Sequence, residues 1–244
     1  MWQSAGWVRD RGLIVFRLNK TSFGSLLCYV TDRHSLSEVQ PAEQLETLLR
    51  KIGTAADAGV DWIQIREKDL SGKDCSSLTH EALGRAARSS ANKNMPTRIF
   101  VNDRLDVTLA ERASGVHLGE KGLPLAEVSR IVESRGERKD FLIGVSCHSL
   151  EAARAAANGG ADYLFFGPVF STPSKVTFGV PQGLERLAEV CRAVAIPVLA
   201  IGGIALANTS ECLAAGAAGI AAIRLFQDVR DMPSLVQSLR ELKS

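Results

Sequence analysis

The stretch Gly160-Ala161-Asp162-Tyr163-Leu164-Phe165-Phe166-Gly167-Pro168 shows the unit from which this chain is built. It opens with a glycine suited to end a helix, continues as a short apolar run, and closes on a Gly-Pro pair that stops a strand. An apolar run without polar alternation is typical of a parallel strand that is covered on both faces. Related glycine turns at Gly59-Val60-Asp61 and Gly216-Ala217-Ala218-Gly219 also precede apolar runs. The repeated turn predicts helices that alternate with buried parallel strands.

Outward from this stretch, the same alternation runs along the chain from Leu26. The apolar runs predict strands at Leu26–Thr31, Asp61–Arg66, Arg98–Val101, Gly115–Leu118, Phe141–Val145, Tyr163–Phe166, Pro197–Ile201 and Gly219–Ile223. Helical patterns follow them near Ala42–Ala58, Lys73–Ala91, Leu105–Ala113, Leu125–Ser134, Leu150–Asn158, Leu184–Ala193, Ala207–Ala215 and Met232–Leu242. Eight strand–helix units predict an α/β fold of the (β/α)8 TIM barrel type, because open doubly wound sheets usually have fewer units.

The domain organisation follows from the length of 244 residues. We expect one barrel domain over residues 26–244. Residues 1–25 are expected to form an N-terminal extension, either a cap over the bottom of the barrel or a disordered tail.

Composition excludes several classes of protein. The net charge of +2 and the lack of a Lys/Arg run give no indication of nucleic-acid binding. No apolar run approaches the roughly 20 residues that span a bilayer, and the N-terminus is a poor signal peptide, so we expect a soluble, cytoplasmic protein without a membrane partner. The five cysteines are scattered, as expected for buried reduced thiols. The oligomeric state stays open.

In a TIM barrel the active site lies at the carboxyl ends of the strands, so the residues there are the candidates for function. Gln64 and Arg66 alternate along one strand and are expected to face the mouth together, with Lys68 on the following loop. A guanidinium and an ammonium group suit a diphosphate. Such charges also occur on ordinary solvated surfaces, but their position directly after an apolar strand favours a binding role.

Glycines and a carboxylate mark further strand ends. Gly202-Gly203 can bring backbone N–H groups close to a phosphate, and the same pair also serves a tight turn. Asn102-Asp103 could place a carboxylate on Mg²⁺, although Asp103 could equally cap the helix that follows. Thr172, Ser174 and Lys175 lie on a loop that is either an ordinary surface loop or a lid over a ligand.

The histidines and cysteines near the strand ends have plainer interpretations. His117 lies inside a strand and is expected to be a hydrogen-bonded core histidine. His148 is expected to support a strand-to-helix turn in which Ser149 is the N-cap. Cys147 is expected to be inert.

Taken in order along the chain, these motifs resemble those of the thiamine phosphate synthase family from about Leu27 to Leu225. The motifs that carry the resemblance are Thr31-Asp32, Gln64-x-Arg66-x-Lys68, Asn102-Asp103, Gly115-Val116-His117-Leu118-Gly119, Gly144-Val145-Ser146-x-His148, Gly167-Pro168-Val169-Phe170, Thr172-Pro173-Ser174-Lys175 and Ile201-Gly202-Gly203-Ile204. The resemblance implies a transferase that couples hydroxymethylpyrimidine diphosphate to hydroxyethylthiazole phosphate and releases pyrophosphate, with Mg²⁺ as cofactor and small phosphorylated molecules as partners.

The resemblance also implies the role of each residue. Gln64 and Asn102 would contact the pyrimidine, and Asp103 would ligate Mg²⁺. The pyrophosphate would be bound by Arg66, Lys68, Asn102 and Lys175, with Ser146 near the reacting methylene. Thr172 and Ser174 would line the thiazole side, and the Gly202-Gly203 turn would hold the thiazole phosphate.

Two positions depart from the family pattern. After Gly119 the family usually has Gln-x-Asp, whose aspartate is the second magnesium ligand, whereas this chain has Glu120-Lys121-Gly122. Glu120 is the candidate substitute. The family's small Val-Ser pair is replaced by Ile223-Arg224, where Arg224 either grips a phosphate or fills the pocket.

These departures keep two other hypotheses open. One is a thiazole tautomerase of the same superfamily, which carries a histidine where this chain has Pro168. The other is a non-catalytic relative that binds thiamine intermediates.

Overall fold

The computed structural model describes residues 7–10, 13–16, 25–36, 39–89, 96–119, 122–171 and 180–242. Eight parallel strands close into a barrel with the order β10-β3-β4-β5-β6-β7-β8-β9. Their bounds are β3 Leu26–Val30, β4 Trp62–Ile65, β5 Arg98–Asn102, β6 Gly115–Leu118, β7 Leu142–Cys147, β8 Tyr163–Phe166, β9 Val198–Ile201 and β10 Gly219–Ala222. The prediction of a TIM barrel is therefore confirmed.

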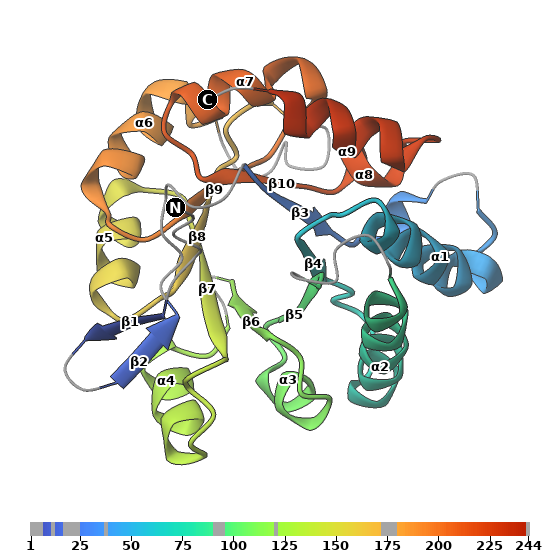
Figure 1. Ribbon diagram of the computed structural model, residues 1–244, viewed down its shortest axis with the longest axis horizontal. Helices are drawn as coiled ribbons and strands as arrows, with labels where there is room; N and C mark the ends of the chain where they lie inside the picture. Colours follow the sequence, from blue (N-terminus) through green and yellow to red (C-terminus); the bar gives the residue numbers. More distant parts are fainter. Residues whose placement is uncertain are drawn as a thin grey trace.

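The helices lie outside the strands, as Figure 1 shows. Their bounds are α1 Gln44–Asp57, α2 Gly72–Arg88, α3 Leu105–Ala110, α4 Leu125–Ser134, α5 Leu150–Asn158, α6 Gly183–Ala193, α7 Leu206–Ala214, α8 Arg224–Gln227 and α9 Met232–Glu241. Two 3-10 turns, Arg33–Ser35 and Pro41–Glu43, precede α1. The sequence did not predict α8, nor the antiparallel pair β1 (Trp7–Asp10) and β2 (Leu13–Phe16) within the proposed N-terminal extension. None of the helices in the described ranges is both long and apolar enough to cross a membrane.

The glycine turns that led to the fold prediction have the expected conformation. Gly59, Gly160 and Gly216 have φ values of 88°, 93° and 95°, which non-glycine residues rarely adopt. Each lies after a helix and just before a strand, so it reverses the chain at the amino-terminal end of the barrel.

Two apolar layers hold the barrel together. One set of strand side chains, including Trp62, Phe100 and Tyr163, fills the interior of the barrel. The alternate set, including Ile63 and Leu164, packs outward against the helices. Because both faces of each strand are covered, the strands are continuous apolar runs in the sequence.

Two largely buried aspartates join the amino-terminal ends of neighbouring strands. Asp61 accepts a 2.7 Å hydrogen bond from the backbone N–H of Leu27, and Arg240 of α9 pairs with its carboxylate at 2.8 Å. Asp162 accepts a 2.7 Å bond from Ile143 N–H and pairs with Arg138 at 3.0 Å.

Each of these arginines also donates to two backbone carbonyls. Arg240 donates to Ser25 and Gly59, and Arg138 donates to Phe141 and Gly160. We call the pairs Arg240–Asp61 and Arg138–Asp162 the two arginine clamps. They join β3 to β4 and β7 to β8, which lie four strand positions apart in the barrel.

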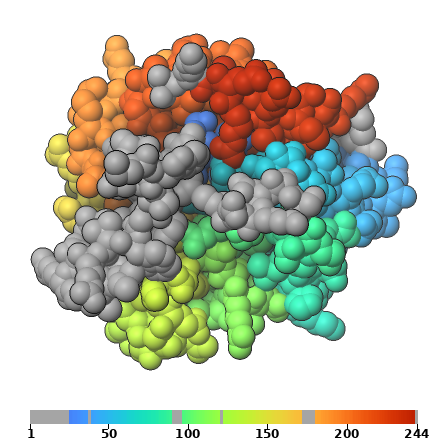
Figure 2. All heavy atoms as spheres, viewed as in Figure 1, coloured from blue at the N-terminus to red at the C-terminus, as the bar shows by residue number. Residues whose placement is uncertain are grey.

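The barrel closes where its last strand, β10, pairs with its first strand, β3. Above this seam the buried Gln227 of α8 accepts a 2.8 Å hydrogen bond from Asp32 N–H. Its amide donates to Asp32 O and Ser35 Oγ, both at 2.9 Å. On the outside α9 packs against α1, and Figure 2 shows α9 in red beside α1 in blue.

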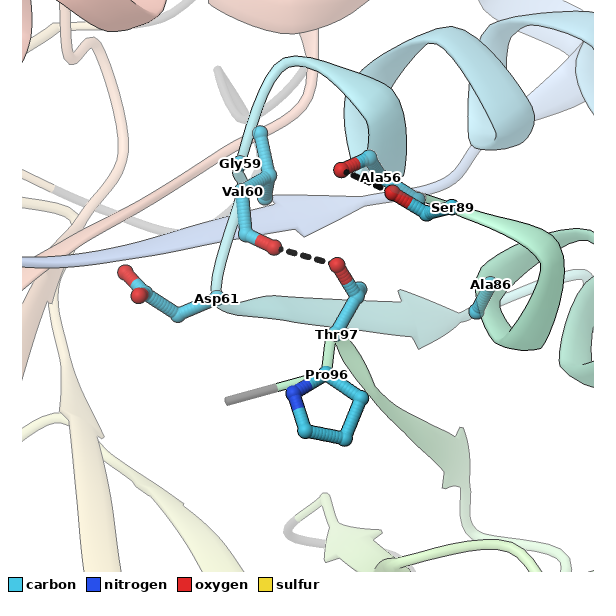
Figure 3. Close-up of a pocket in the computed structure, with 8 residues that line it drawn as sticks. All are labelled: Ala56, Gly59, Val60, Asp61, Ala86, Ser89, Pro96 and Thr97. Carbon is cyan, nitrogen blue, oxygen red and sulfur yellow. Dashed lines mark hydrogen bonds between the residues drawn. The ribbon is translucent and has the colours of Figure 1, made fainter. Parts of the chain in front are cut away.

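A small cavity of about 20 Å³ lies near the starts of β4 and β5, at the end of the barrel opposite to the mouth. Figure 3 shows two hydrogen bonds beside it, from Thr97 Oγ1 to Val60 O at 2.7 Å and from Ser89 Oγ to Ala56 O at 3.0 Å. A space of this size holds about one water molecule and is too small for a substrate.

Candidate active site

A row of hydrogen-bonded polar groups crosses the carboxyl ends of β4, β5 and β6. Gln64 Nε2 donates to Asn102 Oδ1 at 2.8 Å, and Asn102 Nδ2 donates to Asp103 Oδ2 at 2.7 Å. Asp103 Oδ1 accepts the backbone N–H of Gly119 at 2.7 Å. We call these four residues the mouth row. It brings Gln64 and the Asn102-Asp103 pair, distant in sequence, together at the barrel mouth.

Asp103 is not the cap of the following helix. It adopts a left-handed backbone conformation, with φ of 58°, and α3 begins after Arg104 without a side-chain cap. A residue other than glycine rarely adopts this conformation, and here the carboxylate is turned into the mouth row. The helix-cap alternative for Asp103 is therefore wrong.

Gly122 lies directly against the carboxylate of Asp103. A Cβ atom at this position would collide with Asp103 Oδ1. The glycine thus lets the loop after β6 approach Asp103 closely, at the position where the sequence lacks the expected second aspartate.

A cavity of about 210 Å³ opens beside the mouth row. Side chains from the ends of β4 and β5 and from the start of α2 line it: Ile65, Glu67, Lys68, Leu70, Cys75, Asn102, Asp103 and Arg104. Basic, acidic and amide groups converge on this cavity. The cavity lies next to the predicted binding residues Lys68, Asn102 and Asp103.

Arg66 and Lys68 follow β4 at the rim of the mouth. The guanidinium of Arg66 is half-buried and has no hydrogen-bond or ion-pair partner among the residues that the structure describes. It lies close enough to His117 to lower the pKa of that imidazole. Lys68 is exposed and lines the cavity. A half-buried cation without a counter-charge is suited to bind an anion.

Glu67, which lies between these two cations in the sequence, is buried. Its carboxylate accepts the hydroxyl of Thr31 at 2.6 Å and pairs with Arg33 at 3.1 Å. Thr31 Oγ1 in turn accepts the backbone N–H of Arg66 at 2.9 Å. Arg33 also pairs with the exposed Asp69. This anchor fixes the backbone that carries Arg66 and Lys68.

Sequence reasoning missed the role of Glu67. Strand alternation places it on the face opposite to Arg66, where a charged residue is unexpected. No pattern in the sequence indicated its partner Arg33, which lies 34 residues away.

Ser146 lies at the end of β7 with its hydroxyl 2.9 Å from Nε2 of His117. Nδ1 of the same imidazole lies 3.2 Å from the hydroxyl of Tyr163. Burial, and secondly Arg66, lowers the pKa of His117 to about 3, so the ring is neutral at ordinary pH. The prediction of a hydrogen-bonded core histidine is confirmed, whereas the contribution of Tyr163 was not predicted.

The neighbouring predictions also agree with the structure. His148 Nδ1 forms a hydrogen bond with the carbonyl of Gly167, and Ser149 Oγ caps α5 by accepting Ala152 N–H. All five cysteines, Cys147 among them, are buried, and no disulfide joins any two of them.

On the far side of the mouth, Gly202 and Gly203 have φ values of 95° and 67°. A Cβ at Gly202 would lie 2.6 Å from Pro168 Cα, and one at Gly203 would lie 2.6 Å from Ser171 O. Both glycines are therefore required by the turn itself. Ile223 packs toward the barrel interior, and Arg224 is exposed at the start of α8.

Several predicted residues lie outside the described residues: Glu120, Thr172, Ser174 and Lys175. Within the described ranges, His, Cys, Asp and Glu side chains form no group of three or more that could hold a metal ion. Asp103 therefore belongs to no such group in the described part of the mouth.

Comparisons with known proteins agree on one family. The family model described as thiamine monophosphate synthase matches residues 27–226. A putative thiamine-phosphate synthase of Geobacter sulfurreducens is 44% identical over 197 residues, covering 81% of this chain and 84% of that protein. The thiamine-phosphate synthase of Methanocella arvoryzae is 43% identical over 190 residues, covering 78% of this chain and 84% of that protein.

A solved structure of similar fold is the thiamine phosphate pyrophosphorylase from Pyrococcus furiosus. It is 31% identical with a TM-score of 0.73, covering 90% of this chain and 95% of that chain. A 3-hexulose-6-phosphate synthase, at 14% identity and a TM-score of 0.64, shares the fold alone.

Proposed function

The chain belongs to the thiamine monophosphate synthase family, and from this membership we infer that it couples hydroxymethylpyrimidine diphosphate to hydroxyethylthiazole phosphate. It is a thiamine-phosphate synthase, a transferase that moves a pyrimidinylmethyl group and releases pyrophosphate. The observation that carries the assignment of residues is the mouth row beside the guanidinium of Arg66, which has no partner in the described ranges.

We assign the pyrimidine diphosphate to the β4–β5 side of the mouth. Gln64 is 2% exposed, and its Oε1 is buried without a partner among the described residues. This orphaned acceptor suits an amino group of the pyrimidine, since an unpaired buried acceptor costs free energy. Arg66, Lys68 and Asn102, together with Lys175, would bind the diphosphate.

Mg²⁺ is the cofactor that we propose for this side. A single carboxylate with phosphate oxygens and water is a donor set that Mg²⁺ accepts, so Asp103 fits an ion that arrives with the diphosphate. The hydrogen bonds from Gly119 and Asn102 hold the carboxylate in place for this role. Gly122 supplies no second carboxylate, and Glu120 is the remaining candidate ligand. When bound, Mg²⁺ would neutralise part of the diphosphate charge.

We assign the thiazole phosphate to the β9–β10 side. The turn at Gly202-Gly203 exposes backbone to a ligand, and the exposed Arg224 can add a positive charge there. Ile223, packed toward the barrel interior, would line the pocket with Thr172 and Ser174. Both substrates are therefore small phosphorylated molecules that enter one mouth from opposite sides.

The chemistry requires little acid–base catalysis. The bond between the pyrimidine methylene and the diphosphate oxygen breaks, and its electron pair leaves with the pyrophosphate. The resulting cation is captured by the lone pair of the thiazole nitrogen. Arg66, Lys68 and Lys175 stabilise the charge that develops on the leaving group, and Ser146 lies near the reacting methylene. The barrel mouth holds the two reactants in line.

A cytoplasmic location is also proposed, because the five buried cysteines form no disulfide with one another, which suits a reducing compartment.

The decisive assay incubates the purified protein with both substrates and Mg²⁺ and detects thiamine phosphate. Formation of product is expected. Binding of thiazole phosphate without turnover would support the non-catalytic relative, and isomerisation of a thiazole phosphate would support the tautomerase.

The variant Arg66→Ala tests the binding assignment. It is expected to weaken diphosphate binding by about tenfold to a hundredfold, as for loss of a charge-assisted hydrogen bond, with little loss of thermal stability. A large loss of stability with unchanged binding would show that Arg66 is structural.

A further inference from the structure

Three buried or half-buried polar side chains form a line inside the barrel. Tyr163 of β8, His117 of β6 and Ser146 of β7 are joined by contacts of 3.2 Å and 2.9 Å. Tyr163 and His117 are each only 1% exposed, whereas Ser146 reaches the mouth. We call these three residues the Tyr163–His117–Ser146 network.

The network exists because Gly144 leaves room for it. Gly144 lies between His117 and Tyr163 in the strand register, with β7 separating β6 from β8. A Cβ at Gly144 would lie 2.5 Å from the hydroxyl oxygen of Tyr163. The tyrosine ring therefore crosses over β7 at its one position without a side chain and reaches the imidazole on β6.

The hydrogen bonds have a direction. Burial raises the pKa of Tyr163 well above its usual value, so its hydroxyl keeps its proton. Its one acceptor among the described residues is Nδ1 of His117. A neutral imidazole carries a proton on one nitrogen only, so Nδ1 accepts and Nε2 carries the hydrogen.

The tautomer of His117 also decides which group donates in its hydrogen bond with Ser146. Nε2–H of His117 donates to Ser146 Oγ, so the hydroxyl hydrogen of Ser146 is not used within the network. In the opposite tautomer Ser146 would donate its hydroxyl hydrogen to Nε2 of His117, and no donor would be left for a ligand in the mouth. Ser146 is thereby left as a hydrogen-bond donor toward the mouth.

We propose that Tyr163 and His117 are positioning residues that orient the hydroxyl hydrogen of Ser146 toward the oxygen of the departing diphosphate. This inference rests on the proposed function for the identity of the acceptor. A donor that is already oriented toward developing negative charge needs no reorganisation during the reaction. Ser146 acts on the substrate, whereas Tyr163 and His117 act through it.

The first test reads the tautomer directly. The ¹⁵N chemical shifts of His117 are measured in protein labelled at histidine, with the signals identified by their loss in His117→Gln. We expect Nε2–H and bare Nδ1 in the unmodified protein. Tyr163→Phe should shift the ring toward a mixture of tautomers. The Nδ1–H tautomer in the unmodified protein would overturn the proposal, whether or not the protein makes thiamine phosphate.

The chain offers a matched control for the loss of the hydroxyl. Tyr29 is its other tyrosine, is also fully buried, and its hydroxyl has no partner in the described part of the structure. Tyr29→Phe is expected to leave both the ¹⁵N signals and the activity unchanged. An equal effect of both variants would mean that loss of a buried hydroxyl perturbs the barrel in general, which would refute a specific role for Tyr163.

The second test asks whether Tyr163 acts through Ser146. Tyr163→Phe should lower kcat about tenfold, as for loss of one oriented hydrogen bond, with little change in KM. His117→Gln keeps an N–H donor for Ser146, so its loss of activity should be smaller than that of Tyr163→Phe. In a Ser146→Ala background, Tyr163→Phe should have almost no further effect on kcat. Independent, multiplicative effects of the two variants would overturn the proposal.

The two tests separate failure of the inference from failure of the proposed function. If the unmodified protein makes no thiamine phosphate, the proposed function fails, and the tautomer and its response to Tyr163→Phe still decide whether the network orients Ser146.

Discussion

Gly144 has no side chain, and the ring of Tyr163 occupies the space where one would stand. At the level of single residues, the mouth depends on such small positions as much as on charged ones. Gly122 likewise admits the carboxylate of Asp103. Since both glycines lie directly against polar side chains of the site, its geometry depends partly on residues that have no side chain of their own.

His117 predicts a specific dependence of stability on pH. Its pKa is about 3 in the folded protein and near 6.5 when unfolded, so between these values the unfolded chain binds the extra proton. The free energy of unfolding should therefore fall as pH drops from about 6.5 toward about 3. Urea unfolding at a series of pH values measures this loss.

The control for this prediction is His117→Gln, which cannot titrate. Its stability should fall less steeply than that of the unmodified protein over the same acidic range. Parallel curves would show that carboxylates alone produce the acid sensitivity.

At the level of secondary-structure elements, the ends of β3 and β4 are held together by the carboxylate of Glu67. Glu67→Gln should lower the free energy of unfolding by about 1–3 kcal/mol, because the buried ion pair is lost and one acceptor oxygen is replaced by an amide donor. Urea denaturation midpoints give the value.

Asp69→Asn is the matched control, since Asp69 pairs with the same Arg33 but its side chain is 52% exposed. Its cost should stay below about 1 kcal/mol, as for other exposed ion pairs. If both variants lower the free energy of unfolding by the same amount, burial does not determine how much each carboxylate contributes to this anchor.

The elements themselves were predictable from the sequence, because each strand is an apolar run bounded by glycine or polar residues. The strands at Gly115–Leu118 and Tyr163–Phe166 have the predicted bounds. The short helix α8 was not predicted, since four residues carry no periodicity.

The candidate site was predictable to a smaller extent. Gln64, Asn102 and Asp103 could be placed at the mouth because parallel strands end there together. Glu67 and Tyr163 could not be assigned roles, because their partners lie 34 and 46 positions away in the sequence, on other strands or the loops that follow them.

At the level of the whole molecule, the two arginine clamps predict additive effects. Arg138→Ala and Arg240→Ala should each cost about 1–3 kcal/mol, because each leaves a largely buried aspartate without its cation. Burial already raises the pKa of both carboxyls.

The double variant tests independence. The clamps join strand pairs four positions apart in the barrel, so the two costs should sum to within about 0.5 kcal/mol. A larger deviation in urea unfolding would show that the two halves of the barrel are energetically coupled.

The seam at Gln227 has a consequence for how the molecule comes into being. Asp32 and Gln227 are separated by 195 positions, so the edge of β3 stays unpaired until the ribosome has released nearly the whole barrel. Until then the growing chain is an open sheet in which the edge of β3 exposes unpaired backbone N–H and C=O groups. The nascent protein is thus most prone to misassembly late in translation. A stall before β10 would yield fragments in which the edge of β3 can pair with a strand of another chain.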